Sequence, residues 1–268
     1  MKHAWNLRRP TAWIVAVALV ATSLAGQAIR RVAPAAVPVR FPEGTVHGFL
    51  ELHAADGSLA ANGDLQQLPH EGAIESRMIF RFRDSSYFEE TVAFTQHGVF
   101  ALQSYHLVQR GPAFAADLDA SITANGQYVV RSRSHDGKMK DYTGTLEMPP
   151  DVSNGLPIIL LKNLARHDTQ TVHLVAFMPA PRMIQLRLAP VSDARLLNGD
   201  RGETGVEFDL KPVIGGVAGF FGKLLGKIPA DSHVWIVTQG APMFVRFEGP
   251  LYLGPVWRID LTSPHWPR

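Results

Sequence analysis

The chain of 268 residues contains no cysteine. A disulfide framework and a thiolate metal site are therefore excluded, as is lipid attachment through an N-terminal cysteine. Without such crosslinks the fold must rest on its hydrophobic core. The apolar share of 46% is enough to build one.

A strong charge of either sign is also missing, since the formal net charge is only +2. Three of the 26 basic residues fall within residues 1–28, where there is no acid, so the remaining charges nearly balance the 24 acidic ones. No basic run follows Arg30-Arg31. Nucleic acid is therefore not an expected partner.

The common motifs of catalytic and metal sites are absent as well. The sequence has no H-E-x-x-H and no G-x-S-x-G. Glu89-Glu90 cannot act together across one site, because neighbours on a strand point to opposite faces. Ser134-His135-Asp136 precedes a glycine and is typical of a hairpin turn, whereas the members of a catalytic triad come from separate loops. We therefore assign no catalytic residue, no metal and no cofactor. An enzymatic role is left undecided and disfavoured.

The N-terminus has the pattern of a signal peptide. Lys2, Arg8 and Arg9 form a basic start, and residues 13–24 are the apolar stretch WIVAVALVATSL. Small residues at Gly26 and Ala28 predict cleavage after Ala28, so that residues 1–28 are removed. Cleavage after Ala25 is a second possibility. The mature chain is expected to be periplasmic or secreted.

An uncleaved membrane anchor is the alternative for the same segment. The uncharged run from Pro10 to Ile29 is long enough to span a bilayer. Arg30 and Arg31 would then lie on the far side, against the positive-inside tendency, and this favours cleavage. Residues 29–42 are rich in Pro and Ala and predict an extended linker.

Residues 43–268 carry the signals of one antiparallel β domain. Residues 74–82 alternate apolar and charged side chains, with Ile79 as the exception, as expected of a strand with one buried face. Six Asn-Gly or Asp-Gly doublets favour the positive φ of tight hairpin turns. The doublets begin at Asp56, Asn62, Asn125, Asp136, Asn154 and Asn198. Further strands are predicted at 45–54, 57–67, 88–95, 99–109, 116–123, 127–134, 139–147, 170–178, 182–190, 204–210, 233–238, 243–249 and 255–261.

This spacing predicts a mainly β fold, with α+β as a variant: a curved antiparallel sheet or open β-barrel with one or two packed helices. One short helix is expected after Pro157, within residues 151–165. The other is expected in PVIGGVAGFFGKLLGKIP, residues 212–229. That stretch is not a phosphate loop, because the first glycine and the Ser or Thr of the motif are missing. A helix of about 15 residues spans only ~22 Å and cannot cross a bilayer.

Two interpretations of this second helix remain open. Its apolar face includes Val217, Phe221, Leu224 and Leu225. In the first interpretation its glycines let it pack closely against the sheet. In the second it covers a ligand or contacts a membrane surface.

Two stretches place strands and turns in succession: FRDSSYFEETVAFTQHGVFALQSYHLVQRGPAF (82–114) and DSHVWIVTQGAPMFVRFEGPLYLGPVWRIDL (231–261). With its exported start, the chain resembles uncharacterised bacterial secreted or periplasmic families of unknown function over most of its length after residue 43. The architecture also resembles the open half-barrels of periplasmic lipoprotein carriers, in which a curved sheet wraps over helices. The resemblance implies a fold and assigns no working residue.

The function expected from these observations is non-catalytic binding of a hydrophobic or lipid-like ligand, or of an envelope partner, in a β cavity. The candidate ligand-binding residues are Val217, Phe221, Leu224, Leu225, Phe80 and Phe82. A secreted hydrolase acting on sugar or ester bonds is the alternative, and it predicts acids or a histidine converging in one pocket. A structural envelope component is a third hypothesis.

Overall fold

The computed structural model describes residues 36–178, 180–198, 201–213, 231–252 and 254–262. The chain divides into two compact units, Met1–Val32 and Ala33–Arg268, and the description below concerns the second. The predicted signal peptide and residues 214–230 lie outside the described residues. The predictions for both therefore stay predictions. Pro212 and Val213, predicted to begin the second helix, belong instead to the strand Arg201–Val213, so the prediction is wrong for these two residues.

The second unit is mainly β, as the spacing of the strand signals predicted. Its described part contains a single α-helix, which lies between the eighth and ninth strands. The elements in chain order are β1 (Val46–His53), β2 (Leu59–His70), β3 (Ala73–Phe82), β4 (Tyr87–His97), β5 (Val99–Arg110), β6 (Ala116–Thr123), β7 (Gln127–Ser134), β8 (Met139–Thr145), α1 (Pro157–Asn163), β9 (Gln170–Phe177), β10 (Pro181–Asn198), β11 (Arg201–Val213), β12 (Ser232–Val237), β13 (Met243–Gly249) and β14 (Trp257–Thr262).

All fourteen strands belong to one antiparallel sheet in the order β8-β7-β6-β5-β4-β3-β2-β1-β14-β13-β12-β11-β10-β9. The first strand, β1, therefore lies in the middle of the sheet, and the following strands run outward to β8. The chain then crosses to the opposite edge at β9 and returns until β14 pairs with β1. The crossover, residues 146–169, contains α1. In the described part, β8 and β9 are not paired with each other, so the sheet is open.

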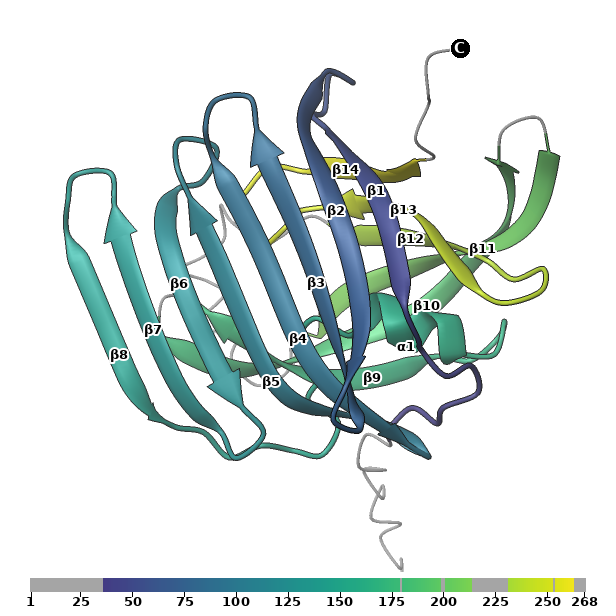
Figure 1. Ribbon diagram of the computed structural model, residues 1–268, viewed down its shortest axis with the longest axis horizontal. Helices are drawn as coiled ribbons and strands as arrows, with labels where there is room; N and C mark the ends of the chain where they lie inside the picture. The colour runs from purple at the N-terminus through teal and green to yellow at the C-terminus, as the bar shows by residue number, and fades with distance from the viewer. Residues whose placement is uncertain (1–35, 179, 199–200, 214–230, 253, 263–268) are drawn as a thin grey trace, which may run out of the picture. The chain divides into compact units, whose positions relative to one another are not determined.

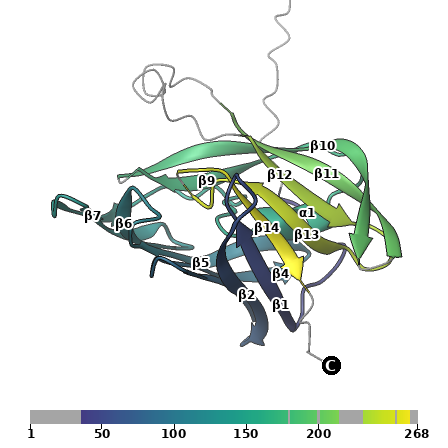
Figure 2. The same ribbon diagram turned by 90° about the horizontal axis from the view of Figure 1, so that it is seen from above.

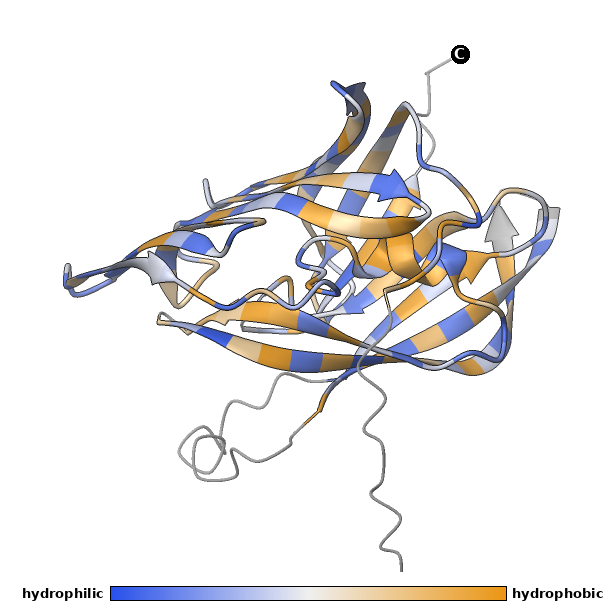
Figure 3. Ribbon diagram, turned by 90° about the horizontal axis from the view of Figure 1, so that it is seen from below, coloured by the Kyte–Doolittle hydropathy of each residue, from blue (hydrophilic) through white to orange (hydrophobic). Residues whose placement is uncertain are grey.

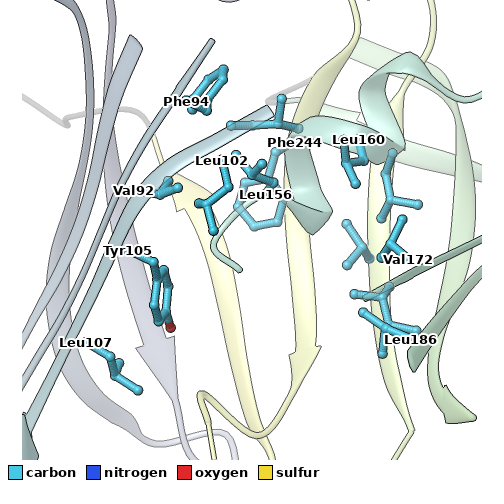
Figure 4. Close-up of a cluster of buried hydrophobic side chains, with 14 of the residues drawn as sticks. Val92, Phe94, Leu102, Tyr105, Leu107, Leu156, Leu160, Val172, Leu186 and Phe244 are labelled. Carbon is cyan, nitrogen blue, oxygen red and sulfur yellow. The ribbon is translucent and has the colours of Figure 1, made fainter. Parts of the chain in front are cut away.

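The sheet is curved, so that β9–β13 lie across from β3–β5 with α1 between the two layers (Figures 1 and 2). The hydrophobic core fills this interior and draws on both layers and on the crossover. Figure 4 shows Val92 and Tyr105 on one side, Leu156 and Leu160 of the crossover, and Leu186 on the other.

Period-two alternation explains why these segments are strands. In β3, Ile74, Ser76, Phe80 and Phe82 are buried while the charged residues between them are not. Figure 3 shows the same alternation of hydrophobic and hydrophilic positions along many strands. Ile79, the exception in the pattern, is buried on the other face. One-sided burial of this kind is what fixes the register of an antiparallel sheet.

Three of the doublets form the predicted hairpin turns, since Gly57, Gly126 and Gly137 all have positive φ. The prediction for Asn62-Gly63 is wrong, because these residues pair with β3 in the middle of β2. A Cβ at Gly63 would lie 2.5 Å from the Phe80 ring, so this glycine allows close approach and does not form a turn. The doublet at Asn198 continues into a residue that the structure does not describe.

The prediction of a hairpin turn at Asn154-Gly155 is also wrong. These two residues lie in the crossover, beside the edge of β9. The Asn154 side-chain amide donates to the carbonyl of Val175 at 2.8 Å, and its oxygen accepts from the Val175 N–H at 2.8 Å. The Ser153 N–H donates to the carbonyl of His173 at 2.9 Å. The crossover thus satisfies backbone groups that an edge strand would otherwise leave unpaired. Gly155, with φ +71°, lies against Val92 and Tyr105 on the opposite layer.

The predicted short helix is confirmed as α1. Pro157 occupies its first turn, where a missing N–H costs nothing. Ile159, Leu160 and Leu161 are buried in the core. Within the described ranges, no helix has the length and apolar character needed to cross a membrane.

Candidate functional site

A cavity of about 380 Å³ lies between the two layers of the sheet beside the crossover. Its wall is mainly apolar and, among the described residues, comes from nine strands, from the crossover and from three connecting loops. The described residues that line it are Met78, Glu90, Tyr105, Asn154, Gly155, Pro157, Ile158, Leu174, Val175, Ala176, Met178, Ile184, Leu186, Leu210, Lys211, Pro212, Asp231, Ser232, Phe247, Pro250, Leu251, Tyr252 and Ile259. Its volume falls within the usual range of small-molecule sites.

Glu90 places a carboxyl group in this apolar wall. It lies in β4 between Met78 of β3 and Leu107 of β5, both at paired positions. The residue is half-buried, and it borders the cavity. The Tyr105 hydroxyl donates to Glu90 Oε1 at 2.8 Å. Burial raises the pKa of Glu90 above its ordinary value, although the hydrogen bond from Tyr105 acts in the opposite direction.

The neighbouring carboxyl, Glu89, has the opposite environment. It lies on the outer face, where Arg77 Nε donates to Glu89 Oε1 at 2.6 Å. This bond is the main cause that lowers the pKa of Glu89. The expectation that Glu89 and Glu90 point to opposite faces is confirmed. Glu89 is paired with a cation at the surface, whereas Glu90 lies in the cavity wall and no described cation contacts it.

Two tyrosines also contribute hydroxyl groups to the wall. The Tyr105 ring stacks on Phe177, with 6.3 Å between the centroids. The Tyr252 hydroxyl accepts a hydrogen bond from the Phe177 N–H. Burial raises the pKa of both Tyr105 and Tyr252, so both phenols stay neutral near neutral pH.

A charged group lies where β11 ends and β12 begins. Lys211 Nζ is 2.8 Å from Asp209 and 3.2 Å from Asp231. Its pKa is raised, chiefly by the hydrogen bond to Asp209. Lys211 and Asp231 both line the cavity. The ammonium group of Lys211 is thus already paired with two carboxylates.

The predicted ligand-binding residues have different outcomes. Phe80 and Phe82 are buried in the core, and neither is among the residues that line the cavity. Phe82 packs edge-on against Phe114 and Trp257. Val217, Phe221, Leu224 and Leu225 lie outside the described residues, so their role stays a prediction.

Sequence reasoning missed Glu90 and Tyr105, although a signal for Glu90 was present. Phe88, Glu90, Val92 and Phe94 occupy alternate positions in β4, which places one acid in an otherwise apolar row. A charged residue on a buried face is rare unless it has a function or a partner. The contact with Tyr105 depends on strand pairing fifteen residues away and has no local signal.

A second buried acid, Asp151, has a structural explanation. His173 Nδ1 lies 2.8 Å from Asp151 Oδ1, and His173 Nε2 lies 3.2 Å from the Gln185 side-chain nitrogen. Both ring nitrogens of His173 therefore have partners. These contacts link Asp151 of the crossover to His173 of β9 and Gln185 of β10. The described residues include no cluster of three or more potential metal ligands.

The outer face carries ion pairs both between neighbouring strands and within one strand. Arg246 and Arg258 donate to the two oxygens of Asp260 at 2.6 and 2.8 Å. Ser134, His135 and Asp136 form the predicted hairpin turn, where the Ser134 hydroxyl donates to Asp136. The interpretation of both segments as surface structure is consistent with these contacts.

Comparisons with known proteins give little further guidance. No protein-family model matches the chain, and no curated protein matches it. A crystal structure of a beta-barrel-like protein of domain of unknown function DUF1849 from Brucella abortus matches 85% of this chain and 98% of that chain. The sequence identity is 9% and the TM-score 0.44. We base no argument on a likeness at that level.

Proposed function

We propose that the protein binds one small hydrophobic molecule in the cavity between its two layers. The observation that supports this is an apolar cavity of about 380 Å³ whose wall includes a carboxyl–tyrosine pair. Apolar walls supply affinity through desolvation, and a few polar groups fix orientation.

The volume limits the size of the ligand. At ~30 Å³ for a group the size of a water molecule, the cavity holds roughly a dozen such groups. This corresponds to one medium-length chain or a small ring system. A complete two-chain lipid would extend beyond the described walls.

The proposed compartment is the bacterial periplasm or the cell exterior, on the strength of the signal-peptide pattern in residues 1–28. The resemblance to periplasmic lipoprotein carriers belongs to the same proposal. The hydrolase hypothesis expected acids or a histidine to converge in one pocket. The described wall contains two acids, Glu90 and Asp231, and the second is paired with Lys211.

Ligand occupancy is tested directly on the mature chain. We expect native mass spectrometry of protein purified from its host, without detergent, to show an added small molecule. The empty protein should also bind N-phenyl-1-naphthylamine, an uncharged apolar fluorophore, with saturable fluorescence enhancement.

A cavity-filling variant locates the bound dye. Leu174 lines the cavity, and Leu174→Trp should lower the affinity for the dye at least about tenfold. Leu68 is 53% exposed, and Leu68→Trp adds the same ring at the surface as a control that leaves affinity unchanged. Equal dye binding by both folded variants, with repeatedly empty native spectra, would overturn the proposal.

A further inference from the structure

The two oxygens of Glu90 have different surroundings. Oε1 accepts the hydrogen bond from Tyr105. Among the described residues, no group is hydrogen-bonded to Oε2, and the side chain borders the cavity. One oxygen is thus held by the protein, and the other is left to whatever occupies the cavity.

The protonation state of Glu90 follows from its neighbours. The adjacent strands present Met78 and Leu107, which are apolar, and Tyr105, which is neutral. Among the described residues, the other titratable groups of the wall are Tyr252 and the pair of Lys211 and Asp231. That lysine already contacts two acids, and no described cation contacts Glu90. An acid in an apolar wall, with no cation beside it among the described residues, keeps its proton to a higher pH than a free glutamate does, in agreement with the raised pKa.

The position of this proton is set by Tyr105. Because the phenol donates to Oε1, that oxygen acts as an acceptor. In the protonated form of Glu90 the acid proton therefore resides on Oε2, and the wall then offers one O–H donor to the cavity. A buried donor without a partner costs about 1–3 kcal/mol, so an occupant that accepts this bond is favoured over one that cannot.

We propose, building on the function proposed above, that the ligand is a medium-length apolar chain carrying a carbonyl oxygen, as in an ester or an amide. The Glu90 O–H donates a hydrogen bond to that oxygen, and the apolar wall holds the chain. Binding weakens as the pH rises and Glu90 ionises, because a carboxylate repels a carbonyl oxygen and offers no donor. A primary alkylamine would show the opposite trend, since its ammonium group favours the ionised acid.

Displacement of N-phenyl-1-naphthylamine from the full mature chain tests the ligand class. The probes are methyl decanoate, 1-chlorodecane and decylammonium, which share a ten-carbon chain and differ in the polar end. We expect methyl decanoate to bind about three- to tenfold more tightly than 1-chlorodecane at pH ~5. This preference should shrink as the pH is raised toward ~8.

Three variants separate the role of Glu90 from the role of the cavity. Glu90→Gln keeps a donor and an acceptor but does not titrate, so the preference for the ester should persist at every pH. Glu90→Met removes the donor, and the preference for the ester should disappear while 1-chlorodecane still binds. Glu89→Gln changes the neighbouring acid on the outer face and should behave as the wild type.

The experiments distinguish a wrong ligand class from a wrong binding function. If the decylammonium affinity exceeds that of the ester and rises with pH, or if Glu90→Met keeps the ester preference, the ligand class is wrong while the binding function stands. If no probe displaces the dye and Leu174→Trp binds it normally, the binding function itself fails. Circular dichroism of each variant establishes that it is folded.

Discussion

The two edge strands of the sheet differ in how far they are covered: β9 is covered by the crossover, and β8 is exposed. At β9, the crossover covers the edge strand with a β-bridge, the Asn154 amide and the Asp151–His173 pair. At β8, nearly every residue is exposed, including Met139 at 59%. The β8 edge carries Lys140 and Asp141 and is only seven residues long. Short, charged edge strands are one way in which natural sheets avoid edge-to-edge association.

The comparison shows where the fold concentrates its stability and its proposed function. The crossover that covers β9 also supplies Asn154, Gly155, Pro157 and Ile158 to the cavity wall. Residues on this side should therefore be sensitive to substitution, and chemically similar residues near β8 should tolerate it.

The largest effect is expected at glycine. Gly155 and Gly137 both have positive φ, +71° and +84°. A Cβ at Gly155 would lie 2.9 Å from the Val92 Cβ, whereas nothing lies within 4 Å of one at Gly137. We expect Gly155→Ala to cost about 3 kcal/mol in free energy of unfolding, from backbone strain plus overpacking. Gly137→Ala should cost about 1 kcal/mol, from strain alone. Urea denaturation measures both, and equal losses would show that the crossover is not packed as described.

A smaller effect is expected at asparagine. Asn154 is buried and bonds both backbone groups of Val175, and Asn154→Ala leaves them without partners. We expect a loss of about 2–3 kcal/mol. Asn125 occupies an exposed hairpin turn, and Asn125→Ala should cost under about 1 kcal/mol. Faster amide exchange at Val175 in the Asn154 variant, measured by NMR, would identify the opened edge; unchanged exchange would contradict this role of the crossover.

The third prediction concerns pH and compares wild type with Glu90→Gln. Burial raises the folded pKa of Glu90 above its ordinary 4.5, so the folded state binds more protons than the unfolded state above that pH. Stability from the neutral acid is fully present below pH 4.5 and is lost as the pH rises through the folded value. The melting temperature of the wild type should therefore fall relative to Glu90→Gln between acidic and neutral pH. Glu89→Gln is the control. The pKa of Glu89 is lowered, so its carboxylate stabilises the folded protein above pH 4.5, and the Glu89→Gln variant should lack this contribution.

The smallest effect is expected at the exposed edge. Met139→Lys replaces a side chain that is 59% exposed at the start of β8. The free energy of unfolding should change by no more than about 0.5 kcal/mol. A loss comparable to that of Asn154→Ala would mean that the β8 edge is covered by a partner in solution, and size-exclusion chromatography would then show the assembly.

The alternation of side chains predicted all fourteen strands to within a few residues, except that β10 and β11 run further than expected. Their predicted bounds were 182–190 and 204–210. The polar residues beyond Pro190 break the alternation, but a register shift at that point lets pairing with β11 continue to Asn198. The doublet at Asn62 predicted a turn that does not form. Its glycine instead allows the strand to pack closely against Phe80 inside the sheet.

What the sequence determined by itself are the local properties of the chain: the strands, three of the turns, the short helix after Pro157 and the opposite faces of Glu89 and Glu90. A period of two is a property of each strand alone and can be recognised without knowing its neighbours. The tertiary structure alone decided that β14 pairs with β1 and that the crossover lies between the layers. These long-range arrangements form the cavity and place Glu90 in its wall, with no described cation in contact with it, because burial depends on contacts between residues far apart in the chain.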